Sequence, residues 1–413
     1  MTDTDGVSSA SRPDSPASTR TRRETWGLVF GATLMSTGVA AYEIAPASVT
    51  PLIRSSLGIG PTIAGLIIGT MMGTAVVASL PAGAILDRTS SRTAIVVASL
   101  TLVLAGLWGL RAGLRGDYVA VIASRILGGL VYVIVWNAGI DLVSRGVDPA
   151  YRATAVGVFT ASGPVGFSIG LGVGPLVAEQ FGWAAIFAAF TGLSVLGSVV
   201  FWPASRTLAT DRDDAPTRND LGSVLRNGHV LVIGLLALLI YGLYFFVNSW
   251  AASYLTTEIG LSMASSGLLV AVFPGIGVVS RISGGALSDR VFDGRRRPVV
   301  VASFGMTAPL LLVFTHVQNL PVLGGMLLLT GFAVQLTIGL LYTFVREVVD
   351  RKVAATAVAI LTSVGMSGAF FAPIVGGAVI RTAGYDVAFT LSGAVAILGL
   401  FVTLRVPEPG GAS

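Results

Sequence analysis

The sequence predicts an all-α membrane protein with twelve transmembrane helices, arranged as two bundles of six. Of its 413 residues, 53% are apolar and 11% are charged, whereas a soluble domain carries about 25% charged residues. Apolar stretches long enough to cross a bilayer recur along the chain, and the second half repeats features of the first. One soluble core of this length cannot bury so much apolar surface, so lipid must cover much of it.

The apolar stretches are interpreted as helices because ~20 residues cross the hydrocarbon core and a helix pairs its own backbone groups. The twelve predicted spans are Trp26–Thr50, Thr62–Leu86, Thr93–Leu110, Tyr118–Val143, Ala153–Ala178, Ala184–Trp202, Val230–Tyr254, Met263–Leu287, Pro298–Thr315, Pro321–Val345, Val353–Ile380 and Val387–Leu404. They form an N-terminal bundle (26–202) and a C-terminal bundle (230–406), joined by a polar linker (203–229). Residues 1–25 are expected to be a disordered tail and not a signal peptide, and 407–413 a second tail.

Basic residues predict that both termini lie in the cytoplasm. With that orientation, 20 of the 26 Lys and Arg residues fall in cytoplasmic segments, four fall in outside loops, and Arg125 and Arg281 lie within spans. Cytoplasmic loops carry such an excess. The net charge of +5 therefore indicates topology in the plasma membrane, not binding to nucleic acid.

The two halves match when the sequence is shifted by 202 residues. Leu57-Gly58-Ile59 falls on Ile259-Gly260-Leu261, Ala64-Gly65-Leu66 on Ser266-Gly267-Leu268, Gly83 to Arg88 on Gly285 to Arg290, and Ala153 to Val156 on Ala355 to Val358. Six spans is an even number, so the second half has the same orientation as the first.

Several motifs resemble those of the major facilitator superfamily. The loop Gly83-x-x-x-Asp87-Arg88-x-Ser90-Ser91-Arg92 is similar to its signature, with serines in place of the usual Gly-Arg. Arg125-x-x-Gly128-Gly129 resembles its span 4 element, and Phe181-Gly182-Trp183 its entry to span 6. Gly163-x6-Gly170-x3-Gly174-Pro175 resembles its antiporter motif but continues as Ala178-Glu179 where that motif has Gly-Gly. The resemblance implies two parallel six-helix halves with a site between them near mid-membrane.

The same resemblance implies a gate at the cytoplasmic helix ends. Gly83 and Gly285 would permit close helix approach, while Asp87, Arg88 and Arg92, and in the second copy Asp289 and Arg290, would form contacts that break during transport. Asp141, at the end of span 4, is the expected partner of Arg88 or Arg92. A static surface ion pair is the alternative. Gly163, Gly170, Gly174 and Pro175 are expected to serve helix packing.

Three charges inside spans are candidates for function, because a charge at mid-membrane is costly. Arg281 breaks the internal repeat, since Ser79 stands at the matching position. Arg281-x-x-x-Gly285-x-x-x-Asp289 resembles helix 8 of monocarboxylate and oxalate transporters, which implies that Arg281 holds a substrate carboxylate. A guanidinium can bind two oxygens of a planar anion. The alternative is a buried ion pair that fixes packing.

Glu43 and Arg125 are expected to serve proton coupling. Burial favours the neutral form of a carboxyl group, so Glu43 is a candidate proton carrier; its alternative role is that of permanent partner to Arg125. Further substrate-binding candidates are Tyr241, Tyr244 and Asn248 on one face of span 7, Tyr42, which aligns with Tyr244, and the polar residues Asn137 and Gln335. Helix packing is the alternative role of the aromatic face.

The sequence therefore predicts a secondary transporter of a small organic or inorganic anion, driven by protons or by exchange with a counter-substrate. Proton-coupled export of lipophilic drugs is the alternative, and a membrane sensor without transport is a third possibility. The chain has no cysteine, and its two histidines fall in loops, so neither an enzyme nor a cofactor or metal site is expected. The protein is expected to be a monomer in the lipid bilayer.

Overall fold

The computed structural model describes residues 22–86, 89–148, 151–205, 226–350 and 353–406, and these are helical without a strand. The first half contains α1 (Arg22–Ser48), α2 (Thr50–Leu57), α3 (Pro61–Leu86), α4 (Ser91–Leu114), α5 (Tyr118–Gly146), α6 (Arg152–Thr160), α7 (Ser162–Phe181) and α8 (Ala185–Ala204). The second contains α10 (Gly228–Thr257), α11 (Met263–Gly275), α12 (Gly277–Arg290), α13 (Arg297–Val313), the short 3₁₀ helix η1 (Phe314–His316), α14 (Leu320–Glu347) and α15 (Ala354–Thr403). The predicted all-α fold is confirmed.

The described residues form eleven helical segments that are long and apolar enough to cross a membrane. The last of them contains two predicted spans, because α15 is interrupted at Gly384, whose φ is 84° and ψ is 175°. This backbone conformation is open to glycine, which has no Cβ. Since Gly384 lies between the predicted spans Val353–Ile380 and Val387–Leu404, the structure agrees with twelve spans.

Two predicted spans are broken in the middle. Span 5 consists of α6 and α7, which meet at Ala161, and span 8 consists of α11 and α12, which meet at Ile276. Pro164 and Pro274 lie beside these breaks, and proline has no N–H to donate within a helix. Both broken spans lie at the boundary between the two halves.

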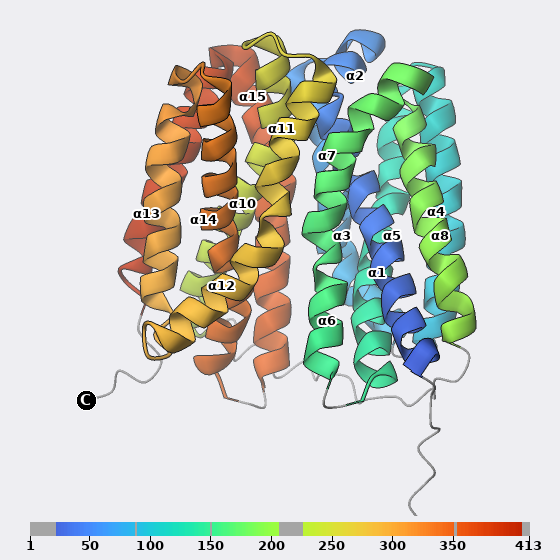
Figure 1. Ribbon diagram of the computed structural model, residues 1–413, viewed down its shortest axis with the longest axis vertical. Helices are drawn as coiled ribbons and strands as arrows, with labels where there is room; N and C mark the ends of the chain where they lie inside the picture. Colours follow the sequence, from blue (N-terminus) through green and yellow to red (C-terminus); the bar gives the residue numbers. More distant parts are fainter. Residues whose placement is uncertain (1–21, 87–88, 149–150, 206–225, 351–352, 407–413) are drawn as a thin grey trace, which may run out of the picture.

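The two halves form two bundles that stand side by side (Figure 1). In the first, α1 packs against α5, α7 and α8; in the second, α10 and α13 pack against α15, and α12 against α14. The halves meet through α3 with α15, α7 with α11, and α1 with α10. We call the end at which α1 begins the base, and the end that carries α2 the top (Figure 1). The described chain begins and ends at the base, as expected for an even number of spans.

Two contacts between the halves involve residues that the sequence repeat relates to each other. Gly65 of α3 lies so close to α15 that a Cβ would overlap the carbonyl of Pro373, and Gly267 of α11 lies in the same way against the carbonyl of Leu171 in α7. The shift of 202 residues relates both members of each pair. We call these contacts the α3–α15 seam and the α7–α11 seam. Small residues allow such close approach of membrane helices.

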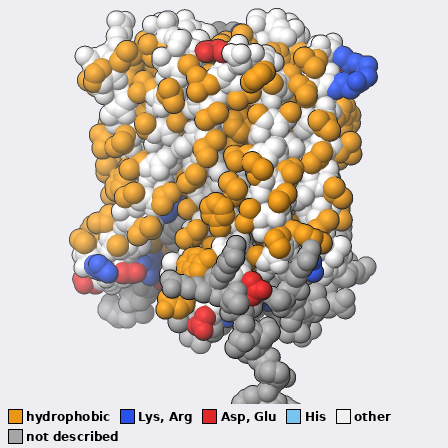
Figure 2. Space-filling view, turned by 45° about the vertical axis from the view of Figure 1, so that its right-hand side comes forward, with side chains coloured by type: hydrophobic (Ala, Val, Ile, Leu, Met, Phe, Trp, Pro, Cys, Tyr) orange, Lys and Arg blue, Asp and Glu red, His pale blue; other side chains and the backbone are white. Residues whose placement is uncertain are grey.

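The outer surface fits a lipid environment. Figure 2 shows hydrophobic side chains over the middle of the face, with charged side chains gathered toward its two ends. Large apolar residues such as Val77, Ile282 and Phe401 are exposed on the helices. This distribution is that of a multi-pass membrane protein.

Candidate functional site

Arg125 is built into the first half of the molecule. It lies on α5 and is fully buried. Its Nε donates to the carbonyl of Ile67 at 3.1 Å, and its terminal nitrogens donate to the carbonyls of Tyr42 at 2.7 Å, Glu43 at 2.5 Å and Ile68 at 3.4 Å. Its guanidinium also lies 5.2 Å from the centre of the Tyr42 ring. Arg125 therefore ties α5 to α1 and α3, and its donors are occupied by backbone.

Arg281 of α12 has a different environment. It is half-buried and lines a cavity of about 750 Å³ between α1, α6, α7 and α12. One terminal nitrogen donates to Gln335 Oε1 at 3.3 Å, while its Nε is buried without a hydrogen-bond partner. Among the described residues, no carboxylate lies within ion-pair distance of Arg281. The other polar residues of the cavity wall are the hydroxyl-bearing Thr33, Thr37, Thr154, Thr160 and Ser162.

Gln335 of α14 has both ends of its amide engaged by protein. It is fully buried. Its Nε2 donates to the carbonyls of Phe273 and Pro274 at 3.1 and 3.3 Å, at the end of α11, and its Oε1 accepts from Arg281. The sequence predicted Gln335 as a substrate-binding residue; in the structure its amide contacts Arg281 and the end of α11.

Tyrosines from both halves interact electrostatically with Arg281, namely Tyr132 of α5 and Tyr241 and Tyr244 of α10. The hydroxyls of Tyr241 (α10) and Tyr342 (α14) lie 2.9 Å apart. The hydroxyl of Tyr132 (α5) is within electrostatic range of Glu43, Arg281 and Tyr342. Phenol groups of both halves, the Glu43 carboxyl and the Arg281 guanidinium are therefore coupled electrostatically across the boundary.

The sequence analysis missed Tyr132 and Tyr342. Each lies seven residues, about two turns, after a residue that was singled out: Tyr132 follows Arg125, and Tyr342 follows Gln335. Residues at this spacing share a helix face, so extending each polar face by two turns would have found both.

Glu43 of α1 is buried, and its Oε1 has no hydrogen-bond partner. Arg125 contacts the backbone carbonyl of Glu43, and no ion pair joins the two side chains. The alternative in which Glu43 is the permanent ion-pair partner of Arg125 is therefore not what the structure shows.

Tyr42 and Tyr244 align in the repeat but lie in different surroundings. Tyr42 packs within the first half, with its ring 5.6 Å from that of Phe187. Tyr244 stacks on Phe167 of α7 at 5.7 Å and on Phe273 of α11 at 5.6 Å. Tyr244 therefore helps to close the contact between the halves.

The two predicted asparagines differ in burial. Asn248 is fully buried; its Nδ2 donates to the carbonyl of Tyr244 at 2.8 Å, and its Oδ1 has no partner. Asn137 is exposed on α5 and donates to the carbonyl of Val133 at 2.9 Å. Asn248 thus keeps an acceptor without a partner, whereas the Asn137 side chain is hydrogen-bonded to its own helix.

The predicted gate of the first half is described only in part. Gly83 lies near the base end of α3, and Asp87 and Arg88 lie outside the described residues. Asp141 forms an ion pair with Arg145 and accepts a hydrogen bond from Ser91 at 2.6 Å. Arg92 instead lies 4.2 Å from the ring centre of Trp202. The predicted pairing of Asp141 with Arg92 is therefore wrong, because the Arg92 side chain packs on α8.

In the second half, Asp289 belongs to a charge cluster at the base. Arg296 donates to Asp289 at 2.5 Å and makes two bonds to Glu347 of α14, at 2.8 and 3.1 Å. The hydrogen bond to Glu347, aided by that to Asp289, raises the pKa of Arg296. Arg290 is exposed, and a Cβ on Gly285 would meet nothing within 4 Å. Gly285 is therefore not at a close helix contact, and the cationic partner in the cluster is Arg296, which sequence analysis did not single out.

The predicted packing residues of span 5 divide into two groups. A Cβ on Gly170 would lie 2.7 Å from the carbonyl of Ala41, and one on Gly174 would lie 2.5 Å from Ser48 Oγ, so both glycines serve close contact with α1. Pro175 lies at the α7–α11 seam. Gly163 has open space around it, so it serves no such contact.

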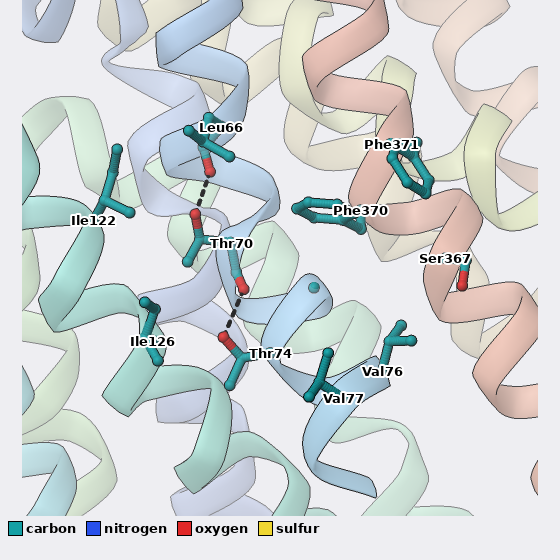
Figure 3. A pocket seen from close by; sticks show the side chains of 11 residues that line it. Leu66, Thr70, Thr74, Val76, Val77, Ile122, Ile126, Ser367, Phe370 and Phe371 are labelled. Carbon is teal, nitrogen blue, oxygen red and sulfur yellow. Dashed lines mark hydrogen bonds between the residues drawn. The ribbon is translucent and has the colours of Figure 1, made fainter.

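A second cavity of about 590 Å³ lies between α3, α5 and α15 (Figure 3). Its walls are mostly apolar, including Val77, Ile126, Phe370 and Phe371. The hydroxyls of Thr70 and Thr74 donate to carbonyls one turn back in α3, at 2.6 and 2.9 Å. This cavity therefore offers no charged group to an ion, unlike the one beside Arg281.

Comparisons with known proteins agree with this architecture. The sequence profile of the Major Facilitator Superfamily matches residues 28–373 and 285–413. The chain is 21% identical over 385 residues to the hexuronate transporter of Bacillus subtilis, covering 87% of this chain and 89% of that protein. It is 26% identical over 322 residues to a probable nitrate/nitrite transporter of Mycobacterium tuberculosis, covering 76% and 79%. A crystal structure of a bacterial homologue of the human lysosomal transporter Spinster matches the fold with a TM-score of 0.76 at 15% identity, over 94% of this chain and 97% of that one.

Proposed function

We propose, since this chain belongs to the Major Facilitator Superfamily, that it is a secondary transporter of a small monovalent anion, which Arg281 holds between the two halves. The observation that carries the proposal is the state of Arg281. It lines the cavity between the halves, keeps a buried Nε without a partner, and has no carboxylate beside it in the described part of the chain. A partly buried cation without a counter-ion is unfavourable, and an anionic ligand would supply the missing charge.

The charge of the ligand follows from the two arginines. Arg125 has its donors bound to backbone carbonyls, so Arg281 is the cationic side chain that the cavity offers among the described residues. A guanidinium fork matches two oxygens of a carboxylate or of a planar inorganic oxyanion. The names of the two relatives, a hexuronate transporter and a nitrate/nitrite transporter, describe one anion of each kind.

Glu43 is the proposed site of proton coupling. Its carboxyl lies in the first half without an ion-pair partner, within electrostatic range of the Tyr132 hydroxyl, which in turn is within range of Arg281. For the pair Glu43 and Arg281, a proton alone leaves one uncompensated positive charge and an anion alone leaves one negative charge, whereas both together leave none. This complementarity supports movement of proton and anion together.

The test is a binding screen on purified protein. The probes are D-glucuronate, nitrate and benzoate, with tetraphenylphosphonium representing lipophilic cationic drugs. Ligands that bind the folded state raise the melting temperature, so at least one anion should raise it and the cation should not. Arg281→Lys should weaken the binding of that anion by about 10- to 100-fold, which corresponds to one hydrogen bond to a charged group. Arg281→Gln should abolish it.

Arg111→Gln is the matched control, because Arg111 is exposed at the end of α4 and its removal should leave binding unchanged. Stabilisation by tetraphenylphosphonium alone would favour drug export. Unchanged anion binding by a well-folded Arg281→Gln protein would overturn the proposal.

A further inference from the structure

The joint between α11 and α12 needs hydrogen-bond donors from outside its own helix. The last carbonyls of a helix have no intrahelical partner, and α11 ends at Gly275, just before the break at Ile276. Gln335 of α14 reaches this point: its Nε2 lies 3.1 Å from the carbonyl of Phe273 and 3.3 Å from that of Pro274. Gln335 therefore caps the end of α11 from a neighbouring helix.

The other end of the same amide contacts Arg281. Its Oε1 accepts a hydrogen bond from a terminal nitrogen of Arg281 at 3.3 Å. The chemistry of the neighbours fixes this orientation, because a flipped amide would turn its oxygen toward carbonyl oxygens and its NH2 toward a cation. Gln335 therefore has one arrangement that satisfies both ends.

The amide of Gln335 occupies space that is free because residue 277 is a glycine. Gly277, the first residue of α12, lies so close to Gln335 that a Cβ there would overlap the side-chain amide. Gln335 is also fully buried. The joint, the amide and the guanidinium thus form one connected unit of α11, α12 and α14.

We propose that Gln335 is a positioning residue: it fixes the Arg281 guanidinium in the cavity and ties its position to the α11–α12 joint. This inference rests on the proposed function, in which Arg281 binds the anion. Gln335 does not itself face the ligand. Its contribution is to hold one nitrogen of Arg281 so that the remaining donors stay directed at the cavity, which spares the ligand the entropy of ordering a flexible side chain.

The experiment measures affinity and transport in Gln335→Met, which keeps the length of the side chain and removes its polar atoms. D-glucuronate, nitrate and benzoate are the probes, in melting-temperature titrations and in uptake by proteoliposomes. We expect Gln335→Met to raise KM by about 10-fold, the lower end of what one hydrogen bond to a charged group contributes, with a maximal rate within about two-fold of wild type. Gly277→Ala, which displaces the amide, should raise KM in the same direction. Gly305→Ala on the neighbouring helix α13, where a Cβ meets nothing within 4 Å, is the matched control and should behave as wild type.

A double-mutant cycle separates positioning from a structural role. In an Arg281→Lys background, Gln335→Met should have little further effect on affinity, because the group that it positions is gone. Equal losses in both backgrounds, a fall in maximal rate with unchanged KM, or unchanged affinity in both Gln335→Met and Gly277→Ala would overturn the inference and leave the proposed function intact. Failure of the wild-type protein to bind any of the three anions would overturn the proposed function, and this inference with it.

Discussion

The two halves of the molecule each carry one arginine within a membrane helix, and the two side chains have opposite environments. Arg125 in the first half is fully buried and donates to carbonyls of α1 and α3. Arg281 in the second half lines a cavity, contacts one amide, and keeps a donor without a partner. We therefore propose that Arg281, whose donors remain available, marks the binding site, and that Arg125 is a structural element of the bundle.

The difference between the two arginines should have its largest effect on folding. Arg125→Leu should lose most of its folded protein, because four hydrogen bonds that tie α5 to α1 and α3 are lost. The buried carbonyl of Tyr42 is then left without a donor, since Pro46 four residues on has no N–H, and one such group costs about 1–3 kcal/mol. Arg281→Leu should keep a near-normal folded yield, since it breaks one hydrogen bond. Size-exclusion profiles and melting temperatures in detergent would measure both. A stable Arg125→Leu protein beside an unfolded Arg281→Leu protein would reverse the assignment of the two roles.

The two arginines also show which features could be predicted from the sequence and which could not. Apolar length, the distribution of basic residues and the 202-residue repeat are properties of the chain itself, so the twelve spans could be predicted, and even the seam glycines Gly65 and Gly267 stand in the aligned segments. The sequence shows that a position carries a guanidinium, but the partners of its donors come from other helices. For that reason, only the three-dimensional structure shows that Arg281 keeps a donor without a partner and that the donors of Arg125 are bonded to backbone carbonyls.

The errors at the base have a similar cause. Asp141 was expected to pair with Arg88, which lies outside the described residues, or with Arg92, but Arg145 lies one turn away on the same helix and forms an ion pair with Asp141. In the second half, Arg296, in the loop before α13, forms ion pairs with Asp289 and Glu347. Where several charged side chains lie close together, spacing along the chain does not decide which of them form ion pairs.

A second prediction concerns the carboxyl that the first half contributes. Glu43→Gln mimics the protonated side chain, so the protein should still exchange anion for anion but should no longer use a proton gradient. The ratio of uptake at pH 5.5 to that at pH 7.5 should fall to about 1 if the carboxyl is the group that carries the proton. Glu258→Gln is the control, because Glu258 is an exposed carboxylate at the end of α10. A pH ratio in Glu43→Gln equal to that of wild type would remove Glu43 from the coupling mechanism.

A third prediction concerns the feature in which the halves agree, the α3–α15 and α7–α11 seams. Gly65 lies against the carbonyl of Pro373, and Gly267 lies against that of Leu171, with no room for a Cβ at either glycine. Gly65→Ala and Gly267→Ala should each force two helices apart, at a cost of about 1–3 kcal/mol for overpacking. Because the repeat relates the two contacts, the effects should be similar in size, in contrast to those of the two arginines.

The chain has no cysteine, so a single introduced cysteine can report on each seam. Ser266→Cys and Ala64→Cys occupy matching positions beside Gly267 and Gly65, and both sites are buried. A water-soluble maleimide should label each cysteine a few-fold faster when the adjacent glycine carries the alanine substitution, because a destabilised seam is open for a larger fraction of the time. Gly285→Ala is the control for a methyl group added without a clash. If one seam opens and the other does not, the two contacts are unequal in energy despite their matching geometry, and the symmetry of the halves is then confined to their backbone.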